Sequence, residues 1–79
     1  MTPSERAILT FFRRYNIGPA EMLFFNPNDF KLPMAPFNSA MESLVRRGLV
    51  IKERHKLAYS LTDHGYDVSL ALEQQTAKR

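Results

Sequence analysis

Residues 44–53 read LVRRGLVIKE, and the spacing of apolar residues changes within this segment. Before Gly48, apolar side chains recur at helical intervals, at Phe37, Ala40, Met41, Leu44 and Val45. After Gly48, Leu49 and Ile51 alternate with other residues in the period of two that is typical of a strand. A glycine at this position accepts the positive φ that ends a helix and reverses the chain. The segment therefore predicts a helix over residues 36–47, with Pro36 in its first turn, followed directly by a strand.

A second alternating stretch occupies residues 57–61, after the short polar connection Arg54, His55 and Lys56. Two alternating stretches joined in this way predict a β-hairpin over residues 49–61 with a basic tip. Thr62 then stands where a helix N-cap is expected, and Asp63 follows it in the first turn. These signals predict a last helix over residues 63–74.

The N-terminal half begins with residues 2–5 (TPSE), which have the spacing of a capping box with proline at the first helical position. An apolar stripe follows at Ile8, Phe11, Phe12 and Tyr15. The capping box and the stripe predict a first helix over residues 2–16. Pro19 then predicts a second, short helix over residues 19–25 that turns Met22, Leu23 and Phe25 inward.

Prolines at positions 27, 33 and 36 predict an irregular segment over residues 26–35. The six phenylalanines are interpreted as core, because a short chain without tryptophan needs its large side chains inside. The expected fold class is α+β and mostly helical, in a single domain that spans residues 1–79.

This order of elements resembles the winged helix-turn-helix domain, and two segments carry the resemblance. Residues 44–53 are similar to the end of a recognition helix that turns through glycine into the first wing strand. Residues 59–66 (YSLTDHGY) are similar to the second wing strand running into the "Leu-Thr-x-x-Gly" start of the next helix, as in MarR-like and PadR-like regulators. The resemblance covers residues 37–72 and implies three helices, a two-stranded wing and a C-terminal helix. It further implies that the helix at 36–47 enters the DNA major groove while the hairpin tip contacts the backbone or the minor groove.

The charge distribution suggests where DNA would bind. Residues 46–56 hold five cationic side chains against Glu53 alone, a local charge of +4, whereas the remaining residues sum to −1. Asn38 and Ser39 are the polar side chains best placed for base edges. The candidate DNA-binding residues are Lys31, Asn38, Ser39, Arg46, Arg47, Lys52, Arg54, His55 and Lys56. The alternative for the basic residues is a solvated face whose cations complement the end of a helix.

Residues 35–43, the start of the predicted recognition helix, contain no Lys or Arg, and Glu42 faces phosphates unfavourably. Two function classes therefore stand side by side. One is a DNA-binding transcriptional regulator acting on duplex DNA. The other is a winged-helix module for protein interaction, an adaptor or subunit of a larger assembly that does not bind DNA. A continuously positive surface over the helix and the wing would favour the first class.

The sequence offers no catalytic pattern, because it has no cysteine and its two histidines have no nucleophile or metal-ligand spacing around them. We therefore expect no enzymatic activity, no cofactor and no metal. The longest apolar run is too short to cross a bilayer, so a cytoplasmic protein without a membrane partner is expected. Apolar residues on more than one face of the last helix predict a homodimer interface at Tyr66, Leu70 and Leu72. The alternative is that this helix is embedded between the first helix and the hairpin of its own chain.

Overall fold

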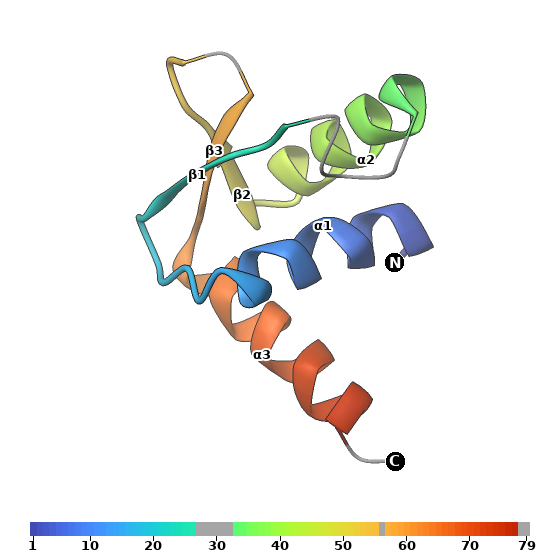
Figure 1. The fold of residues 1–79 in the computed structure, drawn as a ribbon, viewed down its shortest axis with the longest axis vertical. Helices are drawn as coiled ribbons and strands as arrows, with labels where there is room; N and C mark the ends of the chain where they lie inside the picture. Colours follow the sequence, from blue (N-terminus) through green and yellow to red (C-terminus); the bar gives the residue numbers. More distant parts are fainter. Residues whose placement is uncertain (27–32, 56, 78–79) are drawn as a thin grey trace.

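The computed structural model describes residues 1–26, 33–55 and 57–77, with side chains up to residue 74. Within these residues the chain forms three helices and a three-stranded antiparallel sheet, an α+β fold (Figure 1). The elements in chain order are α1 (Pro3–Arg14), β1 (Met22–Phe24), α2 (Met34–Arg46), β2 (Val50–Lys52), β3 (Ala58–Leu61) and α3 (Asp63–Ala77). None of the described helices is long and apolar enough to cross a membrane.

The sheet has the strand order β1-β3-β2, so β3 lies in the middle and pairs with both neighbours. Ser60 is opposite Met22 of β1 on one side and opposite Ile51 of β2 on the other. The predicted hairpin over residues 49–61 is therefore present as β2 and β3, but it is two-thirds of a larger sheet. In Figure 1 the sheet stands beside α2, while α1 crosses below them and α3 runs away from the sheet.

The helix predicted over residues 19–25 is wrong, because this segment contains strand β1 instead. Pro19 forms a bridge with Leu61, and Ala20 has a φ of 67° while its N–H donates to the Leu61 carbonyl over 2.9 Å. A positive φ at this position is incompatible with a right-handed helix. The apolar residues that follow alternate between inward and outward positions, as in a strand. An apolar run this short is compatible with a helix or a strand, so the sequence alone does not distinguish them.

The other predicted boundaries differ at the ends. Helix α2 begins at Met34, two residues before the predicted start, with Pro33 as an N-cap that has no side-chain hydrogen bond. Most of the predicted irregular segment, residues 27–32, lies outside the described residues, as does Phe30. Helix α1 ends at Arg14 rather than at residue 16, and α3 continues to Ala77 beyond the predicted residue 74.

The turn after α2 has the geometry that the glycine predicted. Gly48 has a φ of 76°, its N–H donates to the Val45 carbonyl, and the Leu49 N–H donates to the Leu44 carbonyl, each over 3.0 Å. These two bonds form the Schellman motif that satisfies the last carbonyls of a helix. The motif sends the chain directly from α2 into β2 and so fixes how the hairpin stands against the helix.

The side chain of Thr62 links the end of α2 to the start of α3. Its hydroxyl donates to the Gly48 carbonyl over 2.7 Å and accepts from the Gly65 N–H over 2.9 Å. Gly65 is buried so close to β2 that a Cβ built on it would lie 1.9 Å from the Leu49 carbonyl oxygen. The glycine in the sequence 61–65 is thus required by close backbone packing between α3 and the start of β2.

The core lies between α1, α2 and the inner face of the sheet. Its largest fully buried side chains include Phe12, Ile8, Leu9, Met41, Leu44 and Leu61. Phe25 is central to it, because its ring centroid lies within 6 Å of the rings of Phe11, Phe12, Phe37 and Tyr59. The interpretation of the phenylalanines as core holds for these positions. It is wrong for Phe24, which is 58% exposed.

Candidate nucleic-acid interface

Helix α2 has one buried and one exposed face. Phe37, Ala40, Met41 and Leu44 are buried, as the helical period predicts, whereas Val45 of the same stripe is 39% exposed. The exposed face carries four polar side chains, Asn38, Ser39, Glu42 and Arg46. Both residues predicted to contact base edges, Asn38 and Ser39, therefore lie on the surface of the helix. The face they belong to contains one carboxylate and one guanidinium.

A groove of about 520 Å³ runs between α2 and the β2–β3 hairpin. It is lined by Asn38, Met41, Glu42, Val45, Arg46, Lys52 and Tyr59. Met41 and Tyr59 are buried and form its apolar floor. Burial, and after it the Glu42 carboxylate, raise the pKa of the Tyr59 hydroxyl. The helix wall carries charges of both signs, Glu42 and Arg46, and the hairpin wall carries Lys52.

Lysine 52 shapes the hairpin as well as the groove. Its Nζ donates to the carbonyl oxygens of Glu53 over 2.7 Å and of His55 over 2.9 Å. The same ammonium group lies 5.3 Å from the centroid of the Tyr59 ring. The backbone carbonyls of Glu53 and His55 thus surround the Lys52 ammonium group. Lys52 therefore lines the groove while two of its three donors are used within the hairpin.

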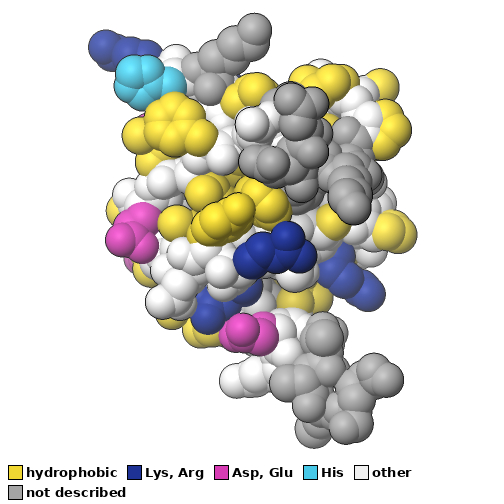
Figure 2. Space-filling model, in the orientation of Figure 1, with side chains coloured by type: hydrophobic (Ala, Val, Ile, Leu, Met, Phe, Trp, Pro, Cys, Tyr) yellow, Lys and Arg dark blue, Asp and Glu magenta, His cyan; other side chains and the backbone are white. Residues whose placement is uncertain are grey.

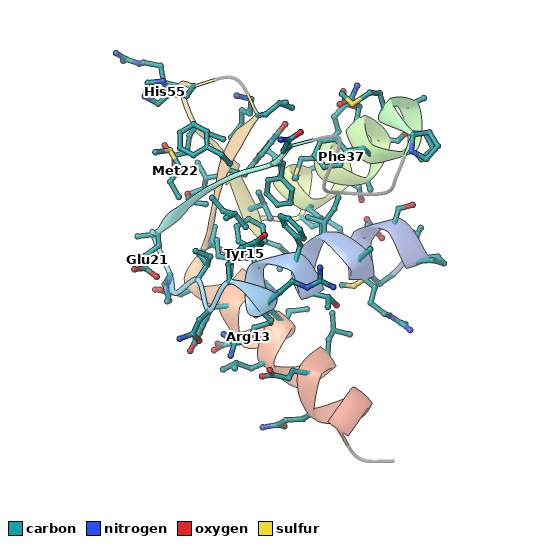
Figure 3. The ribbon with its side chains drawn as sticks, in the orientation of Figure 1. Arg13, Tyr15, Glu21, Met22, Phe37 and His55 are labelled. Atoms are coloured by element: carbon teal, nitrogen blue, oxygen red, sulfur yellow. The ribbon has the colours of Figure 1, made fainter. Side chains whose placement is uncertain are left out.

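The hairpin tip holds two of the predicted DNA-binding residues. Arg54 and His55 are both exposed, and His55 stands at the far end of the hairpin in Figure 3. Within the described part of the chain, Arg54 and Arg46 have no carboxylate within ion-pair distance. Both guanidinium groups are therefore available to an anionic ligand.

Arginine 47 belongs to a different arrangement. Its guanidinium Nη1 lies 3.3 Å from the carboxylate oxygen Oε2 of Glu5, whose side chain is buried against the end of α2. The Ser43 hydroxyl, the backbone N–H and the hydroxyl of Thr2, and the Arg47 charge lower the pKa of Glu5 to about 2. Arg47 thus holds α1 against α2, which is a structural role that the spacing of charges in the sequence did not indicate.

The structure therefore divides the predicted DNA-binding set. Arg46, Arg54 and His55 are exposed without a competing ion pair among the described residues, Lys52 faces the groove, and Arg47 is paired with Glu5. Lys31 and Lys56 lie outside the described residues. The surface is not continuously positive, because Glu42 stands between Asn38 and Arg46 along the helix.

The residues predicted for a dimer interface lie on α3. Tyr66 and Leu72 are partly buried and pack against the core of their own chain, and Leu70 is half-buried. The Arg13 guanidinium of α1 stacks 5.5 Å from the centroid of the Tyr66 ring, and its Nε lies 3.3 Å from the Glu73 carboxylate. Packing within the chain thus accounts for Tyr66 and Leu72, and a homodimer interface on this helix stays a prediction.

A surface that the sequence did not indicate lies on the sheet. Met22, Phe24 and Ile51 are among the exposed large apolar residues, with 41, 58 and 49% of their surface accessible. The signal that could have revealed it is strand alternation in residues 22–25, which turns Leu23 and Phe25 inward and their neighbours outward. The helical interpretation of this segment concealed that pattern.

No group of three or more potential metal ligands occurs among the described side chains. Comparison with protein-family models, curated proteins and solved structures finds no match to this chain.

Proposed function

We propose that the protein binds duplex DNA through α2 and the β2–β3 hairpin, as a small transcriptional regulator of the winged-helix type. The observation that carries the proposal is the groove between these elements. Arg46 stands on one wall, Lys52 on the other, and Arg54 at the hairpin tip beyond it. A phosphate backbone that enters such a groove meets positive charge from both sides.

The chain path supports the winged-helix interpretation. Helix α2 passes through Gly48 into β2, and β3 passes through Thr62 into α3, in the order that the resemblance implies. A helix of 13 residues is roughly 20 Å long and presents a solvent-exposed face beside the hairpin. These are the dimensions with which a recognition helix enters a major groove.

The exposed side chains suggest which residues would contact bases and which would contact phosphates. The Asn38 amide can pair with an adenine edge, and the Glu42 carboxylate can accept from a cytosine amino group. Arg46, Lys52 and Arg54 would contact phosphates, which position the protein without reading sequence. A face with one carboxylate and no Arg or Lys in its first turns gives little direct readout of guanine. Binding is therefore expected to be mostly electrostatic.

A salt titration of binding to random duplex DNA tests the proposal. Three phosphate contacts per chain give a log–log slope of about −2.7, because each contact contributes about −0.9. The double variant Arg46→Ala/Arg54→Ala should lower the slope to about −0.9. Arg14→Ala, an exposed arginine at the end of α1, is the matched control and should leave the slope unchanged. Absence of binding at about 50 mM salt would overturn the proposal.

A second candidate is a protein-interaction module that does not bind DNA. The exposed apolar side chains of the sheet, Phe24 above all, favour it, because large exposed apolar groups mark interaction surfaces. Glu42 within the groove favours it too. The same titration separates the two functions, since a protein-interaction module has no affinity for duplex DNA of random sequence.

A further inference from the structure

The face of the sheet that points away from the helices exposes three large apolar side chains. Strand pairing puts Met22 and Ile51 in one row, on either side of Ser60, and places Phe24 beside Ala58 in a neighbouring row. Ser60 and Ala58 are buried beneath the three larger side chains. We call this the outer sheet face. Its exposed apolar surface is on the order of 300 Å², a size that is often functional on a monomer.

Charged side chains of opposite sign stand at the two ends of the outer sheet face. Arg54 and His55 lie at the hairpin tip, where the His55 ring is 6.1 Å from the Phe24 ring. Glu21, which is exposed and accepts a hydrogen bond from the Gly18 N–H through its carboxylate, precedes Met22 at the other end of β1. Figure 2 shows this order along one margin of the molecule, from Lys or Arg and His through hydrophobic side chains to an acidic one. Figure 3 labels His55, Met22 and Glu21 in the same succession.

A surface that is cationic at one end, apolar in the middle and anionic at the other end is complementary to its own copy. A two-fold axis through the middle brings Arg54 against the partner's Glu21, and this contact occurs twice. Glu21 and Phe24 are separated by roughly 10 Å of strand, so the two charge pairs flank a narrow apolar centre. We infer that the protein forms an antiparallel dimer through the outer sheet face, with a second copy of this chain as the partner.

One further observation supports this choice of face, because helix α3 uses Tyr66 and Leu72 for its own core. On the outer sheet face, the Glu53 carboxylate accepts a hydrogen bond from the Ser60 hydroxyl over 2.6 Å, so this anionic group already has a partner within its own chain. The face is smaller than the roughly 800 Å² per partner of a standard interface, so the dimer should be weak.

The inference does not depend on DNA binding. Because Arg54 would serve both surfaces, DNA and the second copy compete for the hairpin tip. Self-association is therefore measured without DNA, and DNA binding is measured on dilute protein. Either property can fail while the other is observed, so the two results are distinguishable.

Sedimentation equilibrium of the full chain from about 10 µM to about 1 mM tests the interface. A monomer–dimer equilibrium is expected, and Phe24→Ser should weaken it at least about tenfold because the substitution removes the apolar centre. Tyr15→Ser is the matched control. Tyr15 is a comparably exposed aromatic residue, at 52%, but lies at the end of α1, so its replacement should leave the dimer unchanged.

Charge exchange tests the antiparallel arrangement. Glu21→Lys and Arg54→Glu should each weaken the dimer, and the double variant should restore it, because the exchanged charges again face each other. Circular dichroism checks that each variant is folded. A folded chain that stays monomeric at about 1 mM would overturn the dimer. A double variant no stronger than either single one would overturn its antiparallel arrangement.

Discussion

At the scale of single residues, Gly65 is a position where the structure leaves no room for a side chain. Its N–H is bonded to the Thr62 hydroxyl, and the Leu49 carbonyl occupies the space that a side chain would need. The contact is between two backbones, so no rotamer change can relieve it. Any side chain at this position must move α3 away from the start of β2.

Gly65→Ala should therefore lower the free energy of unfolding by about 3 kcal/mol or more. Gly18→Ala is the control, because the atom nearest to its built Cβ belongs to a side chain, the Glu21 carboxylate oxygen 3.2 Å away that accepts from the Gly18 N–H, and not to the backbone. That change should stay within about 0.5 kcal/mol of wild type. Urea unfolding followed by circular dichroism measures both variants, and equal midpoints would contradict the close approach at Gly65.

Single residues also show why the candidate site was only partly predictable. Exposure of Arg46 and Arg54 follows from the helical period and from the hairpin tip, both of which are local patterns. The pairing of Arg47 with Glu5 joins positions far apart in the sequence, and nothing local distinguishes Arg47 from Arg46. The tertiary fold makes that distinction, and it changes one predicted DNA contact into a structural ion pair.

At the scale of elements, strand β1 is the part of the fold that the sequence concealed. The signals for α1, α2, the hairpin and α3 were strong because each combines a period with a cap or a turn residue. Residues 19–25 combine a proline with a short apolar run, a combination that occurs at the start of helices and in strands alike. The deciding fact is the pairing of this segment with β3, and that is a tertiary contact.

The start of β1 contains a strained residue, and this leads to a prediction. Ala20 is exposed and has a φ of 67°, a conformation that costs an L-residue about 1 kcal/mol or more. Ala20→Gly should raise the free energy of unfolding by about 0.5 kcal/mol, since relief of strain exceeds the added freedom of the unfolded chain.

Ala7→Gly provides the control of opposite sign. Ala7 is exposed in the middle of α1, and glycine there should cost about 1 kcal/mol. Thermal melting compares the two variants directly. A lower melting temperature for Ala20→Gly than for wild type would show that the left-handed conformation at residue 20 is not strained.

At the scale of the whole molecule, the Glu5 carboxylate connects the first helix to the end of the second. Its pKa in the folded protein is about 2, below the ordinary value of 4.5, so the charged form is favoured by folding. The stabilisation is complete above pH 4.5 and is lost as the pH falls from 4.5 towards 2. Its size is about 3 kcal/mol, from roughly 1.4 kcal/mol per pKa unit.

The melting temperature of the wild type should therefore fall steeply below pH 4.5, whereas Glu5→Gln should be less stable at pH 7 and flatter in acid. Glu42→Gln is a control, because Glu42 is an exposed carboxylate on α2. Its acid profile should follow that of the wild type. Parallel profiles for wild type and Glu5→Gln would show that Glu5 does not couple stability to pH.

The strand order β1-β3-β2 also has a consequence for how the chain folds. Strand β3 reaches β2 through a short connection, whereas all of α2 and β2 lie between β1 and β3 in the sequence. Because closing the longer loop costs more entropy, we expect the hairpin to form before β1 docks. Until it docks, the edge of the fully buried strand Ala58–Leu61 is open to strands of other chains. In the folded protein, strand β1 covers this edge of β3 by pairing with it.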